Sequence, residues 1–392
     1  MDNPLKYTCL FGGGAIRGLA YVGTLRALEE LGVEFDIIGG SSVGSIFATL
    51  VACGYKSYEL ENLFMKVNFE LFRDIHLGFG KGIALSKGEI FVDWLNELIV
   101  KKMEDPKKKT LNFDELEKEL VIITTDIKNF KAQEFSKYAT PEFEIAKAIK
   151  ISSSMPGLMA PFKYKDGYLV DGDLQKASPM WRLSDTLNNS QSRILEFRLE
   201  GTCAEKDKNP LSFINTIYSC VTDVATDFVS EIYGKNDRYD CININTGDIF
   251  FADFNLNKAA RRKLIDSGYE QTMKYFKEVL PKKKENLLNV YVQINKYLKE
   301  VNKSLKSNNV EDVRWWLGDL FMFLCENKDV IDASIYQQIL EIKDSLLNSV
   351  STLLFFHTKF NNRKQLEVDM KDLLIVLDKR ISELKLFIQT PL

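Results

Sequence analysis

The sequence predicts an α/β fold followed by a helical C-terminal module, for three reasons. Strand-like apolar runs alternate with helical patterns, glycine-rich turns join strand to helix at residues 12–18 and 40–44, and strand signals stop after Pro281. With 392 residues and 45% hydrophobic content, the chain is long enough for one large domain and a smaller one. We place these domains at residues 1–280 and 281–392.

The order of the first elements brings both glycine-rich turns to the same edge of a sheet. Strands are predicted at residues 6–11 and 35–38, and helical patterns cover residues 19–31 and 46–53. A strand, helix, strand, helix order implies a right-handed crossover and a parallel sheet. Each turn follows a strand, so both turns are expected at the carboxyl edge of that sheet.

Later segments continue this pattern and then change it. The α/β region is predicted to close with a helix over residues 258–279 that ends before Leu280, and an all-α tail follows. The tail is expected to pack on the first domain or on a second copy of itself, as a homodimer would. The further strands are predicted at residues 120–125, 133–135, 168–170, 194–199 and 241–245, and the apolar stripes of the tail are Leu287, Val290, Ile294, Leu298, Val301 and Leu305, then Val313, Trp316, Leu320 and Leu324, then Leu374, Leu377, Ile381 and Leu384.

Charge and composition exclude several classes of protein. A net charge of −3 provides no basic field for nucleic acid, and the basic runs at residues 107–109 and 282–284 are interpreted as solvated loops beside prolines. The six cysteines are scattered without metal-ligand or redox spacing. No signal peptide or membrane-spanning stretch is visible, so we expect a cytoplasmic protein whose contact with a membrane is peripheral.

Ser42 is the candidate nucleophile. It lies in Gly40-Ser41-Ser42-Val43-Gly44, between an apolar strand and a helix. This is the pattern of a serine nucleophile elbow, because a sharp strand-to-helix turn needs glycine on both sides. A serine hydroxyl also needs a base to take its proton and backbone donors for the oxyanion that forms.

Histidine, the usual base, fits poorly here. The chain has two histidines; His357 falls within the predicted helical tail, and His76 comes in the wrong chain order for an α/β-hydrolase triad, although it stays open as a minor alternative. Without histidine, a carboxylate held in a dry site must take the proton directly.

Asp171 is the candidate base. It follows the strand predicted at residues 168–170, and Gly172 lets the chain turn away and leave the carboxylate open. The alternative is an ordinary turn aspartate, as expected for Asp166 in a hairpin turn between two strand-like pieces. Asp173 is a close competitor, which could instead bind the glycine-rich loop.

The glycine-rich loop at residues 12–18 admits two functions. A glycine turn between strand and helix also cradles dinucleotide phosphates. The spacing Gly-x-Gly-x-x-x-Gly matches that fingerprint poorly, and a nucleotide-dependent oxidoreductase would leave Ser42 and Asp171 unexplained. We therefore favour a loop that serves Ser42.

In this order the motifs resemble the patatin-like phospholipase family. The resemblance covers roughly residues 5–280 and implies a three-layer α/β/α fold with a mainly parallel central sheet. The matching stretches are the loop at 12–18 with its continuation to 23, the elbow region 35–45, residues 152–157 with Pro161, Asp171-Gly172, and residues 264–269.

The resemblance implies a serine-dependent lipid acyl hydrolase of the phospholipase A or lysophospholipase type. Asp171 is expected to deprotonate Ser42, which attacks a fatty-acyl ester and forms an acyl-enzyme. The substrate is expected to be a phospholipid or lysophospholipid at a membrane surface, with no cofactor or metal. The oxyanion hole is assigned to backbone N–H groups of Gly13, Gly14 and Ala15, and substrate binding to Arg17, Met155, Met159 and Phe162.

Two residues depart from the family pattern. Ala15 replaces the third glycine of the loop, and Asp173 replaces a small residue after the Asp-Gly pair. The extra carboxylate either raises the pKa of the base by like-charge repulsion or faces away from it. Residues 77–82 have the composition of a mobile lid, with a plain flexible loop as the simpler interpretation. The alternative function is a catalytically silent or regulated signalling scaffold that uses the helical tail to bind a partner.

Overall fold

A computed structural model of the chain divides into two compact units. The α/β unit comprises Met1–Gly234 and Arg238–Lys274, and the helical unit comprises Lys235–Asp237 and Tyr275–Leu392. The predicted division into domains at residue 281 stays a prediction. The residues that the structure describes are 6–72, 88–103, 108–174, 193–201, 234, 236–250, 253–353, 357–360 and 362–389.

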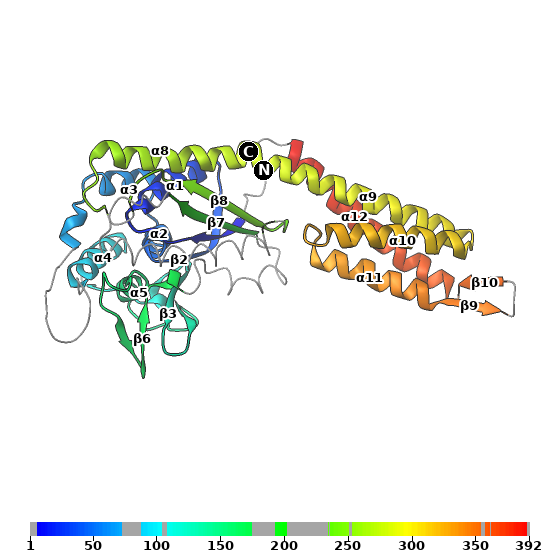
Figure 1. Cartoon of the computed structure of the whole chain (residues 1–392), viewed down its shortest axis with the longest axis horizontal. Helices are drawn as coiled ribbons and strands as arrows, with labels where there is room; N and C mark the ends of the chain where they lie inside the picture. Colours follow the sequence, from blue (N-terminus) through cyan, green and yellow to red (C-terminus); the bar gives the residue numbers. More distant parts are fainter. Residues whose placement is uncertain are drawn as a thin grey trace. The chain divides into compact units, whose positions relative to one another are not determined.

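A mainly parallel sheet forms the centre of the α/β unit (Figure 1). Within the described residues it has eight strands in the order β5-β6-β3-β2-β1-β7-β8, with β4 paired to β3 outside this path. The pairs from β3 through β2, β1 and β7 to β8 are parallel, and β4, β5 and β6 add an antiparallel edge. The strands are β1 (Lys6–Phe11), β2 (Glu34–Ser41), β3 (Glu119–Asp126), β4 (Lys131–Ser136), β5 (Phe162–Tyr164), β6 (Gly167–Val170), β7 (Arg193–Glu200) and β8 (Tyr239–Asn245).

The predicted fold class is confirmed, and every strand predicted from the sequence coincides with an observed one. The turn at Asp166 joins β5 to β6, as expected for a hairpin. Continuous apolar runs identify the central strands because their side chains are buried on both faces of the sheet. The helices of this unit are α1 (Ala20–Glu30), α2 (Val43–Ala52), α3 (Ser57–Phe64), α4 (Glu89–Lys102), α5 (Ile145–Ser152) and α8 (Lys258–Lys274).

Helices α1 and α8 pack with their backbones in close approach (Figure 1). A Cβ added at Gly23 would lie 1.7 Å from the carbonyl oxygen of Ile265, and one at Gly268 would lie 1.9 Å from that of Ala20. Two glycines that face the opposite helix therefore set this contact. Within the described residues, no helix is long and apolar enough to cross a membrane.

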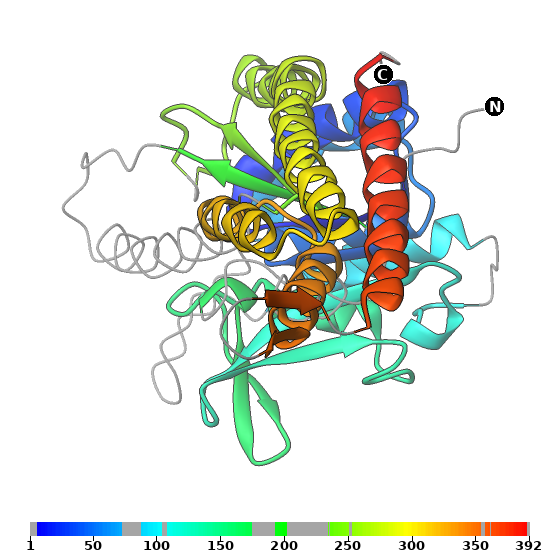
Figure 2. The same ribbon diagram turned by 90° about the vertical axis from the view of Figure 1, so that its right-hand side faces the viewer.

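The helical unit has an apolar core of its own. Figure 2 shows α9 and α12 side by side, and α9 also packs against α10. The predicted stripes lie in this core, fully or partly buried. Side chains of Asn309 and Asp332 accept backbone N–H bonds at the starts of α10 and α11, as N-caps do. The elements are α9 (Leu280–Lys306), α10 (Val310–Asn327), α11 (Ala333–Asn348), β9 (Val350–Leu353), β10 (His357–Phe360) and α12 (Arg363–Gln389).

Two expectations about the tail are wrong. Helix α8 is followed directly by a π-helical turn, Tyr275–Val279, and by α9, so the helical run does not end before Leu280. Pro281 lies in the first turn of α9, directly after the π-helical turn. The tail also contains the antiparallel pair of β9 and β10, and His357 begins β10 instead of lying in a helix.

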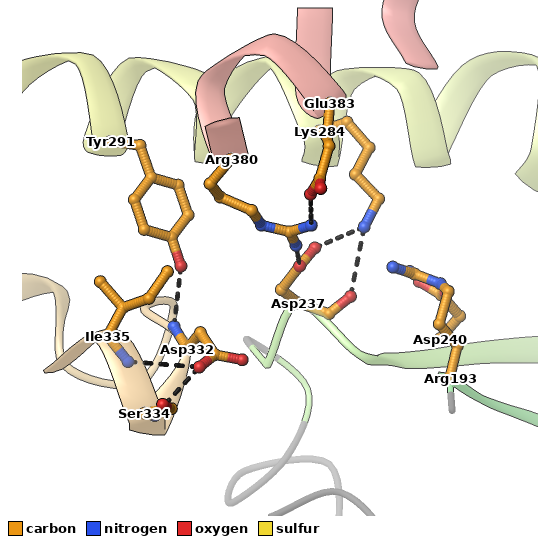
Figure 3. Close-up of polar contacts among 10 residues, drawn as sticks. All are labelled: Arg193, Asp237, Asp240, Lys284, Tyr291, Asp332, Ser334, Ile335, Arg380 and Glu383. Carbon is orange, nitrogen blue, oxygen red and sulfur yellow. Dashed lines mark hydrogen bonds and ion pairs between the residues drawn. The ribbon is translucent and has the colours of Figure 1, made fainter. Parts of the chain in front are cut away.

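The basic run at residues 282–284 was expected in a solvated loop, but it lies in α9. One of its lysines belongs to a buried ion cluster (Figure 3). Lys284 donates to the carboxylate of Asp237 and, at 3.3 Å, to its backbone carbonyl. Arg380 on α12 donates to the second carboxylate oxygen. The side chains of Lys284 and Asp237 are each 3% exposed. The burial of Lys284 is tolerated because a carboxylate from a distant part of the chain pairs with its charge.

Candidate active site

Ser42 lies in the sharp turn between β2 and α2. Its backbone angles are φ 49° and ψ −130°, in the left-handed region that non-glycine residues avoid. A Cβ added at Gly40 would lie 2.4 Å from the backbone of Gly44, and one at Gly44 would lie 2.0 Å from the carbonyl oxygen of Phe11. The turn therefore excludes any side chain at either glycine, as the sequence pattern predicted.

Neighbouring hydroxyl groups hold the strained backbone of Ser42. The N–H of Ser42 donates to Ser152 Oγ at 2.9 Å, and that hydroxyl donates to the carbonyl oxygen of Ile123 at 2.6 Å. The Ser45 hydroxyl donates to the carbonyl oxygen of Ser42 at 2.6 Å. The backbone N–H and carbonyl of Ser42 are therefore both held by hydroxyl groups, while its own hydroxyl bonds to Asp171.

Asp171 follows β6 and lies against the elbow. Ser42 Oγ donates to Asp171 Oδ2 at 2.8 Å, and the N–H of Asp173 donates to Asp171 Oδ1 at 2.9 Å. The backbone N–H of Asp171 is held by the carbonyl oxygen of Ser154 at 3.0 Å. Asp171 is 2% exposed, so its carboxylate lies in a desolvated place where it is oriented by bonds to both oxygens.

The glycine-rich loop between β1 and α1 reaches the same place. A Cβ added at Gly13 would lie 3.0 Å from the Cβ of Ser42. Gly14 has φ 144° and Ala15 has φ 49°, so the departure from glycine at residue 15 puts an alanine in the left-handed region. The structure thus brings Ser42, Asp171 and Gly13 together from three segments that are distant in sequence.

Asp173 turns toward the loop and not toward Ser42. The Ser41 hydroxyl donates to Asp173 Oδ1, and Asp173 Oδ2 lies 1.5 Å from the position that a Cβ on Gly13 would take. Burial, and next the charge of Asp171, raise the pKa of Asp173 well above its usual value, while the bond from Ser41 opposes that shift. Asp173 therefore faces Ser41 and the glycine-rich loop, and its effect on Asp171 stays a prediction.

The residues assigned to substrate binding lie in different surroundings. Arg17 donates to the carbonyl oxygen of Gly14 at 3.4 Å, which ties it to the loop. Met155 is 8% exposed, and the Met159 methyl group lies 2.4 Å from the position that a Cβ on Gly88 would take. Phe162 stacks edge-on against Phe143, with ring centroids 6.4 Å apart. Their roles stay predictions.

His76 and residues 77–82 lie outside the described residues. Sequence reasoning gave no role to Ser41, Ser45 or Ser152, although all three bind the elbow or its neighbour. Ser152 lies in the Ser-Ser-Ser run of the third matching stretch, and that run is the only signal in the sequence that could have identified it.

Comparison with known proteins identifies the family of the segment that contains Ser42, Asp171 and the glycine-rich loop. Residues 10–182 match the family model described as patatin-like phospholipase. Residues 10–182 belong to the patatin-like phospholipase family. The loop, the elbow and Asp171 all fall within this patatin-like domain.

Relatives and solved structures extend the likeness beyond the domain. The uncharacterized protein R571 of Acanthamoeba polyphaga mimivirus is 28% identical over 281 residues, 68% of this chain and 92% of that protein. The probable lipid hydrolase 463L of Invertebrate iridescent virus 6 is 26% identical over 184 residues, 45% of this chain and 63% of that protein. The crystal structure of VipD from Legionella pneumophila aligns with a TM-score of 0.53 and 14% identity, over 99% of this chain and 89% of that one, which shows a shared fold.

Proposed function

We propose that the protein is a serine-dependent lipid acyl hydrolase of the phospholipase A or lysophospholipase type. The observation that carries the proposal is the 2.8 Å hydrogen bond from Ser42 Oγ, on a strained elbow, to the buried carboxylate of Asp171. Membership of the patatin-like phospholipase family, and the lipid hydrolase name of the iridescent virus relative, support this class of substrate.

In the first half of the reaction, Asp171 Oδ2 takes the proton of Ser42 as Oγ attacks the ester carbonyl carbon. The oxyanion that forms accepts hydrogen bonds from backbone N–H groups of Gly13, Gly14 and Ala15, and the N-terminus of α2 adds a favourable dipole. The carbon–oxygen bond to the leaving alcohol then breaks, and Asp171 returns the proton to that alcohol. The products are an acyl-enzyme on Ser42 and a lysolipid or a glycerol-phosphate head group.

In the second half, water attacks the acyl-enzyme. Asp171 takes one proton from the water as its oxygen adds to the acyl carbon, and the same backbone donors hold the second oxyanion. The bond to Ser42 Oγ then breaks, Oγ regains the proton, and the fatty acid leaves. One aspartate serves both steps, so the cycle needs no histidine.

Substrate binding is assigned to the surroundings of the loop. Arg17 offers a cation for a lipid phosphate, and the apolar side chains of Met155, Met159 and Phe162 are assigned to the acyl chain. The substrate then resides in a membrane or micelle that the protein meets from one side. Dimerisation through the helical unit is part of the same proposal.

The test is fatty-acid release from phosphatidylcholine and lysophosphatidylcholine vesicles. We expect Ser42→Ala to abolish release, and Asp171→Asn to lower kcat by about 10²- to 10⁴-fold, the usual contribution of a positioned base. Asp166→Asn is the matched control, since this aspartate lies in an exposed hairpin turn. Folded protein that releases no fatty acid would favour the signalling scaffold, whereas Asp171→Asn protein with full activity would overturn the role proposed for Asp171.

A further inference from the structure

Two β-hairpins extend past the edge of the sheet at which Ser42 lies. In β3, Ile123 pairs with Ser41, and the strand continues for three more residues to Asp126. At about 3.3 Å per residue, the turn between β3 and β4 therefore begins roughly 10 Å beyond the elbow. The β5–β6 hairpin lies beside that turn, because β6 pairs with the end of β3 and runs from the hairpin tip back to Asp171. Both tips project from the edge that carries the proposed active site, and β6 lies at the lower end of the α/β unit in Figure 1.

Contacts between the two hairpin tips join them into one surface. The N–H of Ile127 donates to the carbonyl oxygen of Tyr168 at 3.1 Å. The side chain of Lys128, in the β3–β4 turn, pairs with Asp166, in the β5–β6 turn. Because both a backbone bond and an ion pair cross between the tips, they are held together as a unit. We call residues 126–131 and 162–168 the hairpin platform.

The platform exposes apolar side chains at its tips. Phe130 is 82% exposed, and Ile127 and Tyr168 are 39% and 49% exposed. Phe130 also has φ 52°, in the left-handed region that suits asparagine or glycine in a turn and disfavours a bulky side chain. A ring with this exposure contributes little to the core, and its backbone conformation costs free energy. A strained, exposed phenylalanine therefore indicates a function at the surface.

Lysines surround these apolar side chains. The charged residues of the platform are four exposed lysines and two aspartates: Lys128, Lys131, Lys163, Lys165, Asp126 and Asp166. The chain as a whole has a net charge of −3, so this positive excess is local. Aromatic and aliphatic side chains between lysines match the interface of a bilayer with anionic head groups. The apolar groups enter the head-group region there, while the ammonium groups stay beside the phosphates.

We propose that the hairpin platform docks on the surface of a bilayer that contains anionic phospholipids, with Phe130 inserted among the head groups. This inference rests on the proposed function, because docking serves to present lipid esters to Ser42. The platform begins roughly 10 Å beyond the elbow, so it meets the bilayer before the serine does. Docking then brings the site to the level of the lipid esters.

The experiment measures flotation of the full-length protein with two kinds of vesicle, phosphatidylcholine alone and phosphatidylcholine with phosphatidylglycerol. A Ser42→Ala background keeps the lipids intact during the measurement. We expect binding to the anionic vesicles to be tighter and to weaken with added salt. Phe130→Asn is expected to weaken that binding about tenfold, since a partly inserted ring is lost. Lys131→Gln with Lys165→Gln is expected to weaken it by about 10- to 30-fold.

Matched controls lie away from the platform. Tyr58→Asn removes an aromatic side chain of α3 that is 66% exposed. Lys56→Gln with Lys118→Gln makes the same change in net charge, at two exposed lysines that follow the far end of α2 and directly precede β3. Neither control is expected to change vesicle binding. Controls that weaken binding as much as the platform variants overturn the inference.

Thermal unfolding separates a docking role of Phe130 from a structural one. Asparagine adopts the left-handed conformation more readily than phenylalanine, so Phe130→Asn is expected to keep or raise the Tm of the protein. A structural role would lower the Tm instead, and that result overturns the inference. Light scattering shows whether the platform variants change the oligomeric state. A change in oligomeric state with unchanged vesicle binding identifies a contact between copies of the chain and also overturns the inference.

Labelling of Ser42 by a fluorophosphonate reports on the site without lipid. The Ser42 Oγ–phosphorus bond forms, the phosphorus–fluorine bond breaks, and fluoride and the serine proton leave. Platform variants that keep Ser42 are expected to label at the wild-type rate. Ser42-dependent labelling, together with platform variants that bind anionic vesicles as well as wild type, overturns the inference and leaves the proposed function standing. Absence of labelling, with vesicle binding that the platform variants still weaken, overturns the proposed function and leaves the docking surface. Equal binding to both kinds of vesicle overturns the inference.

Discussion

Removing the carboxylate of Asp237 is expected to destabilise the helical unit far more than removing an exposed carboxylate. Asp237 is the shared partner of Lys284 and Arg380, whose side chains are 3% and 26% exposed (Figure 3). Asp237→Ala leaves Lys284 charged and buried without this partner. Breaking a buried pair by removing one member costs about 3–5 kcal/mol. Because Arg380 reaches solvent, we expect the low end, about 3 kcal/mol.

The matched control is Asp344→Ala on α11. Asp344 pairs with Lys343 at 3.5 Å and is 65% exposed, so its loss is expected to cost less than about 1 kcal/mol. Urea unfolding followed by circular dichroism measures the difference in the free energy of unfolding. Hydrogen exchange of peptides from α9 and α12 shows whether the loss falls on the helices that carry Lys284 and Arg380. Equal losses in the two variants would refute the argument.

Three further predictions concern glycines and Asp173. Gly44→Ala is expected to abolish labelling of Ser42 or to prevent folding, because its Cβ would lie 2.0 Å from the carbonyl oxygen of Phe11; an active, stable variant contradicts this. Gly318→Ala, in the exposed interior of α10 with nothing within 4 Å of the new Cβ, is expected to stabilise by about 1 kcal/mol in urea unfolding, and a loss of stability contradicts this. The raised pKa of Asp173 means that the folded protein keeps a proton which the unfolded chain releases near pH ~3.9, so wild-type stability should fall relative to Asp173→Asn as pH rises above that value. Unfolding curves at several pH values test this, and a difference that is flat or of opposite slope contradicts it.

The elbow and the loop are predictable from sequence because their constraints are local. Gly40 and Gly44 exclude side chains through contacts within the turn and with the end of β1, and a glycine pattern records such contacts directly. The positions of the strands follow from short apolar runs, and the parallel direction of the first two from the strand, helix, strand order. For the same reason the apolar stripes of the tail identify the buried faces of its helices.

The choice between Asp171 and Asp173 could not be made from such local rules. Both are acidic residues of one short turn, and Gly172 permits either to face the serine. Their contacts differ because Ser42 and Ser41, adjacent at a strand end, each donate a hydrogen bond to a different carboxyl group. Only the register that brings β2 beside β3, with β6 on the far side of β3, decides which carboxyl meets which hydroxyl.

The tail shows the same division. Periodicity identified its helices, but it did not reveal that Lys284, expected in a solvated loop, is buried beside Asp237, which lies 47 residues earlier in the chain. By itself the sequence determined the fold class, the strained serine turn, the glycine-rich loop and the helical stripes, since backbone conformation and apolar periodicity depend on neighbouring residues. Only the tertiary structure decided the pairing of charges, the hydroxyl groups that hold Ser42 and the contact of Asp173 with Ser41. Each of these depends on the distance between segments that the chain brings together only when it folds.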